Sequence, residues 1–454
     1  MKKLERRAII CLALSFVLMA GICYYVIMVW NNGGKWISLP SNQHIYNSGY
    51  IATGTIYDRN GKLLVKNNSK GRKVYNDNVT TRKSTLHVVG DTRGNIQTAA
   101  NVIFADKLVG YNFLSGTYST SNKGRKMYLT INSEISNTAL NALGGRNGTV
   151  GVYNYKTGEI LCMVSTPTFD PLSPPTIGKA DTSGAYVNKF ISYKTVPGST
   201  FKLVTAAAAI ENLDYQNFSY QCRGREQYGN ARVDTIKCVG VHGNVNFASA
   251  LAKSCNVSFG RMSIKLGNKT LKKYTKKARL MDSYSINGIE TKPGSFEFPD
   301  GTVNLAWTGI GQYHDLVNPF SMLMYVGAIA NGGSTPEPYI IKRLDTAGGL
   351  PATLSKSTSK KDLLKKSTAN KLAELMRNNV TSNYGQRNFP NLEMCAKSGT
   401  AEVGVGQKPH SWFVGFLKDK PYAFVVLVEH GGYGSETAGA VANKVMQKTV
   451  NDDN

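Results

Sequence analysis

The pattern of apolar and polar positions divides the chain into three stretches. From Ala8 to Trp30 there are 23 consecutive residues without a formal charge. Residues 31 to 125 are mostly polar, with many Asn, Gly, Ser and Lys residues and short strand-like runs such as Thr85–Val89. From Lys126 onward, strand-like runs and apolar helical patterns follow one another. The pattern therefore predicts an apolar helix, a small loop-rich α+β module and one larger domain.

The larger domain begins and ends with predicted strands and has predicted helices between them. The strands are Met127–Ile131, Gly148–Tyr153, Glu159–Ser165, Ser411–Leu417 and Tyr422–Glu429. The helices are Glu134–Leu143, Thr200–Glu211, Phe247–Lys253, Ser258–Leu266, Met322–Ala330, Thr368–Met376 and Gly439–Val450. This order predicts an α/β architecture, in which the first and last segments close one antiparallel sheet and helices flank it.

The uncharged run is long enough to cross a membrane. As a helix of 23 residues it would measure about 34 Å, against a hydrocarbon core of about 30 Å. Four basic residues lie within Met1–Arg7, and basic flanks stay in the cytoplasm. A cleaved signal peptide is the alternative, but its apolar core is usually shorter, about 7–15 residues, and no small-x-small site follows the run here. We expect an uncleaved single-pass anchor, with everything after Trp30 outside the cell membrane.

Composition limits the partners of the exported part. The chain carries 54 Lys+Arg against 29 Asp+Glu, a formal net charge of +25. Such a surplus favours a polyanionic neighbour. Since the anchor places the chain outside the cytoplasm, we expect anionic lipids or acidic wall polymers and not nucleic acid.

The cysteines and histidines give no clear metal signal. Seven cysteines without paired CxxC spacing exclude zinc fingers and a dense disulfide scaffold, and the six histidines show no ligand spacing. We therefore expect no cofactor and no metal. Cys222 and Cys238 flank a polar loop and could form a disulfide worth about 3 kcal/mol, or could remain free thiols.

Candidate chemistry begins with Ser199 and Lys202, which open the Ala-rich helix. Their spacing, i and i+3, puts both side chains on one helical face. This arrangement suits a hydroxyl nucleophile beside an amine base, provided that desolvation or a second cation lowers the pKa of the amine. Ser199 would also lie in the first helical turn, where free N–H groups favour a developing anion.

Two further short motifs follow in the chain. Ser254-Cys255-Asn256 stands between two helical patterns, where the Ser254 hydroxyl can relay a proton and the Asn256 amide can hold a peptide group. Lys397-Ser398-Gly399-Thr400 can supply the second cation from Lys397. Ser398 and Thr400 offer hydroxyls for a carboxylate, and Gly399 would let a substrate backbone approach closely.

Each motif alone is weak, since a chain of this length should contain about one to three Ser-x-x-Lys by accident. Ser357–Lys360, inside a Ser/Lys-rich loop, is such a decoy. The order and context of the three motifs together are far more specific.

The set resembles that of the active-serine penicillin-recognising enzymes. More narrowly, the chain is similar to class B penicillin-binding proteins, which are monofunctional peptidoglycan D,D-transpeptidases. Further similar segments are Gly54–Gly61, Thr157–Ile160, Phe169–Pro171, His242-Gly243, Gly309–Gln312 and Lys397–Glu402. The chain departs from the family where Tyr313 follows Gln312, a position at which a glycine is expected.

The resemblance implies a penicillin-binding transpeptidase or serine β-lactamase-like fold and divides the chain. Residues 1–7 would form a cytoplasmic tail, 8–30 the anchor, 31–125 a pedestal-like or dimerisation module and 126–454 the transpeptidase domain. It also implies Ser199, Lys202, Ser254 and Lys397 as catalytic residues. Asn256, Ser398, Gly399 and Thr400 would bind substrate.

The implied reaction is cross-linking of peptidoglycan stem peptides from D-Ala-D-Ala donors, with β-lactams as covalent inhibitors and no cofactor. A membrane-embedded glycan polymerase of the shape, elongation or division type is the implied partner. Two alternatives stay open from the sequence. One is a hydrolase, either a β-lactamase or a D,D-carboxypeptidase, and the other is a scaffold for a cell-wall glycosyltransferase.

Overall fold

The computed structural model describes residues 2–37, 54–68, 72–109, 124–176, 183–228, 234–300, 303–357 and 359–452. Its central feature is a five-stranded antiparallel sheet in the order β17-β18-β19-β5-β6. The strands are β5 (Gly148–Asn154), β6 (Ile160–Thr166), β17 (Met394–Ala401), β18 (His410–Leu417) and β19 (Tyr422–Val428). The last predicted strand pairs directly with the second one, Gly148–Tyr153, as β19 and β5. The first predicted strand, Met127–Ile131, does not close this sheet, because it forms β4 (Lys126–Leu129) in a second sheet.

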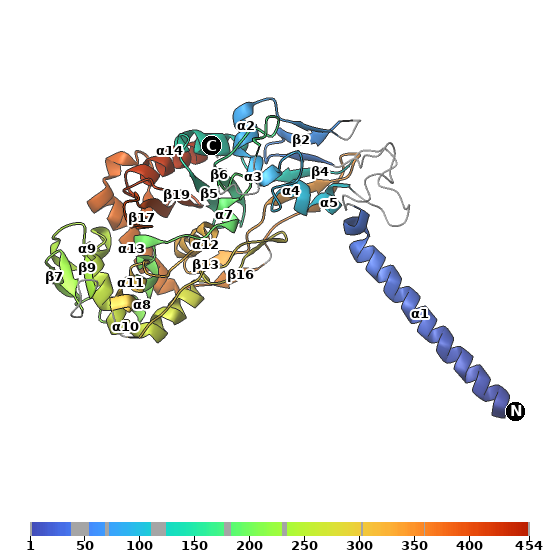
Figure 1. The fold of residues 1–454 in the computed structure, drawn as a ribbon, viewed down its shortest axis with the longest axis horizontal. Coiled ribbons are helices and arrows are strands. Elements are labelled where there is room, and N and C mark those ends of the chain that lie inside the picture. The colour runs from blue at the N-terminus through green and yellow to red at the C-terminus, as the bar shows by residue number, and fades with distance from the viewer. Residues whose placement is uncertain are drawn as a thin grey trace.

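Both faces of this sheet are buried under helices. Along β5, Val150 and Val152 face α6 (Ser133–Leu143) and α14 (Thr437–Asn451), while Tyr153 belongs to the opposite core. This alternation follows from the two-residue period of a strand. The opposite face packs against α12 (Pro319–Ala330), which is buried almost throughout. Figure 1 shows these layers around the sheet.

The remaining helices of the large domain extend the layer beyond α12. They are α8 (Lys202–Asn212), α9 (Phe247–Ala252), α10 (Asn256–Lys277), α11 (Val303–Gly309) and α13 (Lys366–Asn379). Short elements connect them: α7 (Lys189–Ser192), β11 (Ser285–Ile286), β12 (Ile289–Glu290), β13 (Ser334–Pro336), β16 (Lys360–Asp362) and the turns Gly198–Thr200, Val380–Tyr384 and Gln386–Asn388. The predicted fold class, an antiparallel sheet flanked by helices, is confirmed.

One small region beside α10 is built from very short strands. It contains β7 (Ser219–Cys222), β8 (Arg225–Gln227), β9 (Thr235–Lys237) and β10 (Gly243–Asn246). They form two separate two-stranded sheets, β10-β7 and β8-β9. Isolated pairs of this size are marginally stable, so this region depends on contacts beyond its backbone ladders.

A second sheet joins the N-terminal part to the large domain. Its order is β15-β14-β4-β1-β2-β3, and β1 pairs in parallel with β4. Strands β1 (Thr55–Tyr57), β2 (Leu63–Asn67) and β3 (Lys73–Tyr75) come from the N-terminal part, and β4 (Lys126–Leu129), β14 (Ile341–Asp345) and β15 (Pro351–Leu354) complete the sheet. Four short helices lie beside it: α2 (Val79–Ser84), α3 (Leu86–Val89), α4 (Ala100–Ile103) and α5 (Ala105–Val109).

The strand predicted at Thr85–Val89 is wrong, because this segment forms the helical turn α3. The whole of Leu86–Val89 is buried, including His87, so the apolar run reflects burial on all sides and not a strand. The preceding helix α2 is capped by Asn78, whose side chain accepts hydrogen bonds from two backbone N–H groups and stabilises the start of the helix.

The N-terminal helix α1 (Lys2–Ile37) contains the whole predicted apolar run and extends away from the other elements (Figure 1). Its first 32 residues are long and apolar enough to cross a membrane, and large side chains such as Leu12 and Phe16 are exposed. The helix therefore fits a single-pass membrane anchor.

Candidate active site

The structure brings the three predicted motifs together around the side chain of Lys202. Ser199 lies on a 3₁₀ turn (Gly198–Thr200) that leads directly into α8, and its Oγ is 2.9 Å from Lys202 Nζ. Gly198 has φ of +53°, and a side chain there would clash with the backbone of Thr400 on β17. Glycine at this position therefore allows the turn that carries Ser199 to pack against the edge of the sheet.

The second motif occupies the short break between α9 and α10. Ser254 has φ of +54°, a conformation that is uncommon for residues other than glycine. This geometry directs its carbonyl oxygen and its Oγ toward Lys202 Nζ, at 2.8 and 3.2 Å. The Asn256 Oδ1 lies 2.6 Å from the same nitrogen, and the Asn256 amide also donates to the Lys237 carbonyl at 2.8 Å.

The third motif lies on β17. Lys397 Nζ donates to Ser254 Oγ at 3.0 Å and to the Ser398 carbonyl at 2.9 Å. Ser254 Oγ is thus placed between the two lysine nitrogens, so all four residues predicted to be catalytic form one connected group.

Burial sets the electrostatics of this group. Both lysines have 0% exposed surface. Burial lowers the pKa of Lys202 from 10.5 to about 7, although the nearby thiols of Cys238 and Cys255 act in the opposite direction. Burial, and then the charge of Lys202, hold the pKa of Lys397 well below its usual range. A neutral amine at this site is therefore accessible near neutral pH.

The other three predicted substrate-binding residues follow Lys397 on β17, an end strand of the sheet. Ser398 and Thr400 are partly accessible, and Thr400 Oγ1 accepts a hydrogen bond from the Gly434 N–H at 3.4 Å. A side chain at Gly399 would meet Thr200, Pro197 and Trp412. Glycine is needed at this position for packing inside the protein, and its predicted approach to substrate stays a prediction.

Tyr384 also belongs to the site, although the sequence did not indicate it. Its hydroxyl accepts the Ser398 N–H at 2.9 Å and lies 3.0 Å from Ser398 Oγ. The next residue back, Asn383, donates to the Ala252 carbonyl near the second motif at 2.8 Å. Both side chains lie in an irregular turn after α13, which carries no motif that could have identified them.

Some of the segments that are similar to class B penicillin-binding proteins contact this site or stabilise the domain around it. The Gly311 carbonyl accepts the Gly198 N–H at 2.8 Å, so the Gly309–Gln312 segment holds the turn of Ser199. Tyr313, where a glycine was expected, has φ of +69°, a conformation that glycine adopts more readily.

Two more of these segments, Gly54–Gly61 and Phe169–Pro171, connect the N-terminal part to the large domain. Asp58 accepts the Ser133 hydroxyl at 2.7 Å, and Asp170 forms a paired ion contact with Arg82 at 2.6 and 2.8 Å. Both aspartates therefore have a structural role, because they hold the N-terminal part against the large domain and do not contact the active-site residues.

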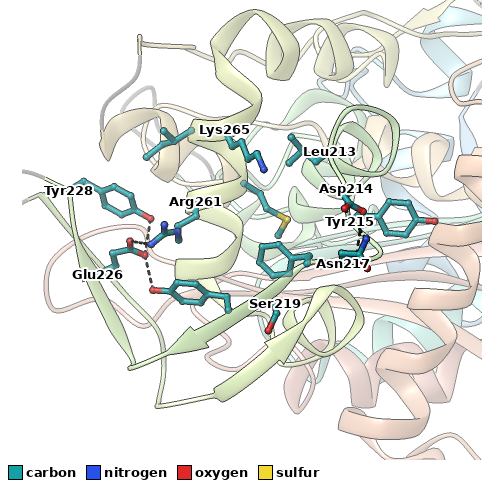
Figure 2. Close-up of a pocket in the computed structure, with 13 residues that line it drawn as sticks. Leu213, Asp214, Tyr215, Asn217, Ser219, Glu226, Tyr228, Arg261 and Lys265 are labelled. Atoms are coloured by element: carbon teal, nitrogen blue, oxygen red, sulfur yellow. Dashed lines mark hydrogen bonds and ion pairs between the residues drawn. The ribbon is translucent and has the colours of Figure 1, made fainter.

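A pocket of about 690 Å³ lies away from the three motifs, between α10 and the chain that enters β7 (Figure 2). Glu226 and Arg261 form an ion pair of 2.6 Å at its wall. Its lining residues are Leu213, Asp214, Tyr215, Asn217, Phe218, Ser219, Tyr220, Glu226, Tyr228, Arg261, Met262, Ile264 and Lys265. None of the predicted site residues is among them, so this pocket is separate from the candidate active site.

The disulfide considered between Cys222 and Cys238 is not present. Their sulfur atoms lie 3.8 Å apart, whereas a disulfide bond measures about 2.05 Å. Both are free thiols, and they gather with Cys255 and His242, which the sequence spacing did not indicate.

Comparison with known proteins identifies the family. The family model described as "Penicillin binding protein transpeptidase domain" matches residues 148–447, which include all three motifs. The chain belongs to this family. The predicted family, fold and enzyme class are thereby confirmed.

Individual relatives agree with this assignment. The chain is 28% identical over 373 residues to peptidoglycan D,D-transpeptidase PbpA of Mycolicibacterium smegmatis, covering 72% of each chain. Its fold is similar to penicillin-binding protein A from M. tuberculosis, solved as a ceftriaxone acyl-enzyme, with a TM-score of 0.77, 22% identity and coverage of 87% and 97%. It is also similar to PBP2 from Helicobacter pylori, solved in complex with MreC, with a TM-score of 0.64, 22% identity and coverage of 73% and 65%.

Proposed function

We propose that this penicillin-binding protein cross-links peptidoglycan stem peptides by acyl transfer from D-Ala-D-Ala donors through Ser199. The observation that carries the proposal is the set of groups around Lys202 Nζ: two carbonyl oxygens, the candidate nucleophile Ser199 and the Ser254 hydroxyl. The relatives named as D,D-transpeptidases support the choice of substrate.

The number of hydrogen-bond donors and acceptors around Lys202 Nζ favours this residue as the base. A neutral amine has two N–H donors and one lone pair. The Ser254 carbonyl and Asn256 Oδ1 can only accept, so they take the two N–H donors. The lone pair is then left for two hydroxyls, and that of Ser199, at 2.9 Å, lies closer than that of Ser254, at 3.2 Å, so Lys202 can remove the Ser199 proton. Positioned bases of this kind contribute about 10²–10⁴-fold to a rate.

The acylation step follows from this arrangement. Ser199 Oγ attacks the carbonyl carbon of the penultimate D-alanine while its proton passes to Lys202. The backbone N–H groups of Ser199 and Thr400 would hold the oxyanion, a contact worth about 3 kcal/mol each. The proton then reaches the departing D-alanine through Ser254, whose hydroxyl also contacts Lys397.

The edge of β17 is the natural place for the stem peptide. An extended peptide can add to an exposed sheet edge through main-chain hydrogen bonds. In that position, the hydroxyls of Ser398 and Thr400 would bind the terminal carboxylate, and Asn256 a peptide group. These assignments come from the family resemblance and the location of the side chains along β17.

An amine of a neighbouring stem peptide resolves the ester and forms the cross-link. One peptide bond replaces another, so the exchange needs no ATP. A β-lactam would be opened by Ser199 in the same way and leave a long-lived ester. The acyl-enzyme of the M. tuberculosis protein supports this expectation.

Labelling with a fluorescent penicillin tests the nucleophile. The detergent-solubilised full chain should be labelled covalently, and mapping should locate the label on the peptide that contains Ser199. Ser199→Ala should lose the label, whereas Ser357→Ala, in the decoy Ser-x-x-Lys, should keep it. Labelling of Ser199→Ala at the wild-type level would contradict the proposal.

The products separate the transpeptidase from the alternatives. With a D-Ala-D-Ala donor and an amine acceptor, a transpeptidase yields the dimer and free D-alanine. Free D-alanine without dimer indicates a carboxypeptidase, and rapid turnover of penicillin a β-lactamase. If a Ser199→Ala strain grows or sporulates normally but the deletion does not, scaffolding is the main function.

We also infer that residues 1–7 lie in the cytoplasm, 8–30 in the membrane, and both 31–125 and 126–454 outside. The basic N-terminal flank supports this orientation. We infer as partner a membrane-embedded glycan polymerase, contacted through the anchor and residues 31–125. The PBP2–MreC complex supports a role in shape or elongation assemblies. Site-specific crosslinking from α1 in cells tests this: capture of a polymerase supports the inference, and its absence among captured proteins contradicts it.

A further inference from the structure

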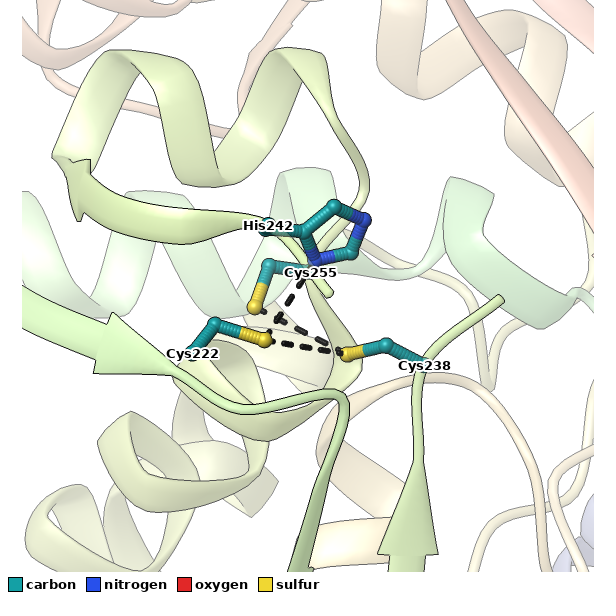
Figure 3. Close-up of side chains that lie close together, drawn as sticks. All are labelled: Cys222, Cys238, His242 and Cys255. Carbon is teal, nitrogen blue, oxygen red and sulfur yellow. Dashed lines mark hydrogen bonds between the residues drawn. The ribbon is translucent and has the colours of Figure 1, made fainter. Parts of the chain in front are cut away.

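Three cysteines and one histidine converge beside the second motif. The metal-ligating atoms of Cys222, Cys238, His242 and Cys255 all lie within 4.8 Å of one another. Figure 3 shows their side chains pointing toward one common point from four separate segments. Cys222 ends β7, Cys238 follows β9, His242 precedes β10, and Cys255 directly precedes α10.

The distances within this cluster match a tetrahedral metal site. With zinc–sulfur bonds of about 2.3 Å, two thiolates of a tetrahedron are separated by about 3.8 Å. The Cys222–Cys238 and Cys238–Cys255 sulfur distances are both 3.8 Å. With a zinc–nitrogen bond of about 2.0–2.1 Å, the expected sulfur–nitrogen separation is about 3.5–3.6 Å. Cys222 Sγ lies 3.5 Å from His242 Nδ1.

Neighbouring donors support thiolates at these positions. The Gly224 N–H donates to Cys222 Sγ at 3.4 Å, and the Ser258 hydroxyl donates to Cys255 Sγ at 3.1 Å. Hydrogen bonds to ligand sulfur are a common feature around bound metals, because they orient the ligand and stabilise its charge.

We propose that Cys222, Cys238, His242 and Cys255 form a structural zinc site that fixes the second active-site motif. Three thiolates and one imidazole are a ligand set typical of four-coordinate structural zinc. The region around it consists of two isolated strand pairs, and a metal supplies stability that so small a core cannot.

The site connects directly to the catalytic group. Cys255 stands between Ser254 and Asn256, so a bond from its sulfur to zinc would fix the backbone on both sides. The Asn256 amide also donates to the carbonyl of Lys237, the residue before Cys238. Zinc would therefore hold Ser254 in its positive-φ conformation and Asn256 against Lys202.

Metal analysis of the detergent-solubilised full chain tests the site independently of activity. Protein purified under reducing conditions without chelator should contain one zinc per chain. Cys222→Ser and His242→Ala should lose it, whereas Cys162→Ala, at a buried cysteine on β6 outside the cluster, should keep it. Binding of Co²⁺ should give the visible and sulfur-to-metal bands of a tetrahedral thiolate site in the wild type and in Cys162→Ala.

Three results would overturn the proposal: a reduced chain that takes up no zinc after reconstitution, a chain that binds iron instead of zinc, or a chain isolated with a Cys222–Cys238 disulfide, which lowers the intact mass by two hydrogens. Since a variant could fail to fold, the wild type is also treated with a chelator and then with zinc. Chelation should expose the cluster thiols to a maleimide, and zinc should protect them again.

A last measurement addresses the link to the motif and rests on the proposed function. Removal of zinc should slow penicillin acylation of Ser199 about tenfold, and readdition should restore it. If zinc binds but its removal leaves acylation unchanged, the metal is present and the proposed link to Ser254 is wrong. If Ser199 is never acylated while zinc binds, the proposed function fails and the metal site remains.

Discussion

The side-chain oxygen of Asn256 lies 2.6 Å from the Nζ of Lys202. This contact, together with the Ser254 carbonyl, uses the two N–H groups of the neutral amine and leaves its lone pair for a hydroxyl, of which that of Ser199 is the nearer. Two fixed acceptors therefore orient the Lys202 amine. Whether the amine can act as a base then depends on its protonation state, which can be tested.

Acylation should depend on pH through Lys202. Burial lowers its pKa to about 7, against the influence of the Cys238 and Cys255 thiols, and the base must be neutral to act. The rate of penicillin acylation should therefore fall about tenfold per pH unit well below 7 and level off above it. Stopped-flow or gel-based acylation rates between pH 5 and 9 give the profile, with circular dichroism as a check on folding. A rate that is flat over this range would exclude Lys202 as the titrating base.

Asn256→Asp should shift the midpoint of this pH profile to higher pH. An opposite charge this close raises the pKa of a lysine by about 1–3 units, so less neutral amine is present at pH 7. The acylation rate at pH 7 should fall about tenfold or more and recover in part at higher pH. Asn246→Asp, an exposed helix cap ten residues before it, is the matched control and should keep the wild-type midpoint. An unchanged midpoint in Asn256→Asp would mean that Asn256 does not influence the base.

Tyr384→Phe should weaken the substrate strand without touching the nucleophile. The change leaves the Ser398 N–H without its acceptor and removes the partner of Ser398 Oγ. A buried unsatisfied donor costs about 1–3 kcal/mol, which corresponds to an acylation efficiency lower by about tenfold. Second-order rate constants with penicillin measure the effect, and Tyr433→Phe, at an exposed tyrosine, should behave like the wild type. Equal rates for Tyr384→Phe and the wild type would show that Ser398 needs no such support.

Asp170→Asn should loosen the contact between the N-terminal part and the large domain. Arg82 holds the pKa of the Asp170 carboxyl below 3.8, so this ion pair stabilises the folded state at neutral pH. Its loss should cost about 1 kcal/mol and lower the melting temperature by a few degrees at pH 7. The difference from the wild type should shrink as the pH falls below 3.8, where the native Asp170 also becomes protonated. Thermal unfolding of both proteins at several pH values measures it, and a difference that does not depend on pH would exclude the ion pair as its cause.

Asp315→Asn should have the opposite effect. Asp315 is fully buried, both of its carboxylate oxygens have no hydrogen-bond partner among the described residues, and burial, followed by the charge of Glu297, raises its pKa well above 3.8. The folded state therefore loses stability as the pH rises above 3.8 toward this raised pKa. The variant removes this cost and should melt higher than the wild type at pH 7 but not at pH 3.5. A lower melting temperature for Asp315→Asn at neutral pH would contradict this account.

The sequence by itself determined those features that depend on local spacing. Ser199 and Lys202 meet because three residues make nearly one helical turn, and β5, β6, β18 and β19 are identifiable because their apolar runs are bounded by turn residues. The length of the uncharged run likewise identified α1 as a candidate membrane helix.

Only the tertiary structure decided which distant segments meet. Ser254 reaches Lys202 across 52 positions and Lys397 across 143, and no periodic pattern encodes such contacts. Tyr384 lies in an irregular turn, and the cluster of Cys222, Cys238, His242 and Cys255 comes from the ends of short elements and the turns between them. Side-chain direction at such positions depends on the elements packed around them. The strand predicted at Thr85–Val89 is the helical turn α3 for the same reason. All of Leu86–Val89 is buried by surrounding elements, and a short run that is buried on all sides has no periodic pattern that distinguishes a strand from a helix.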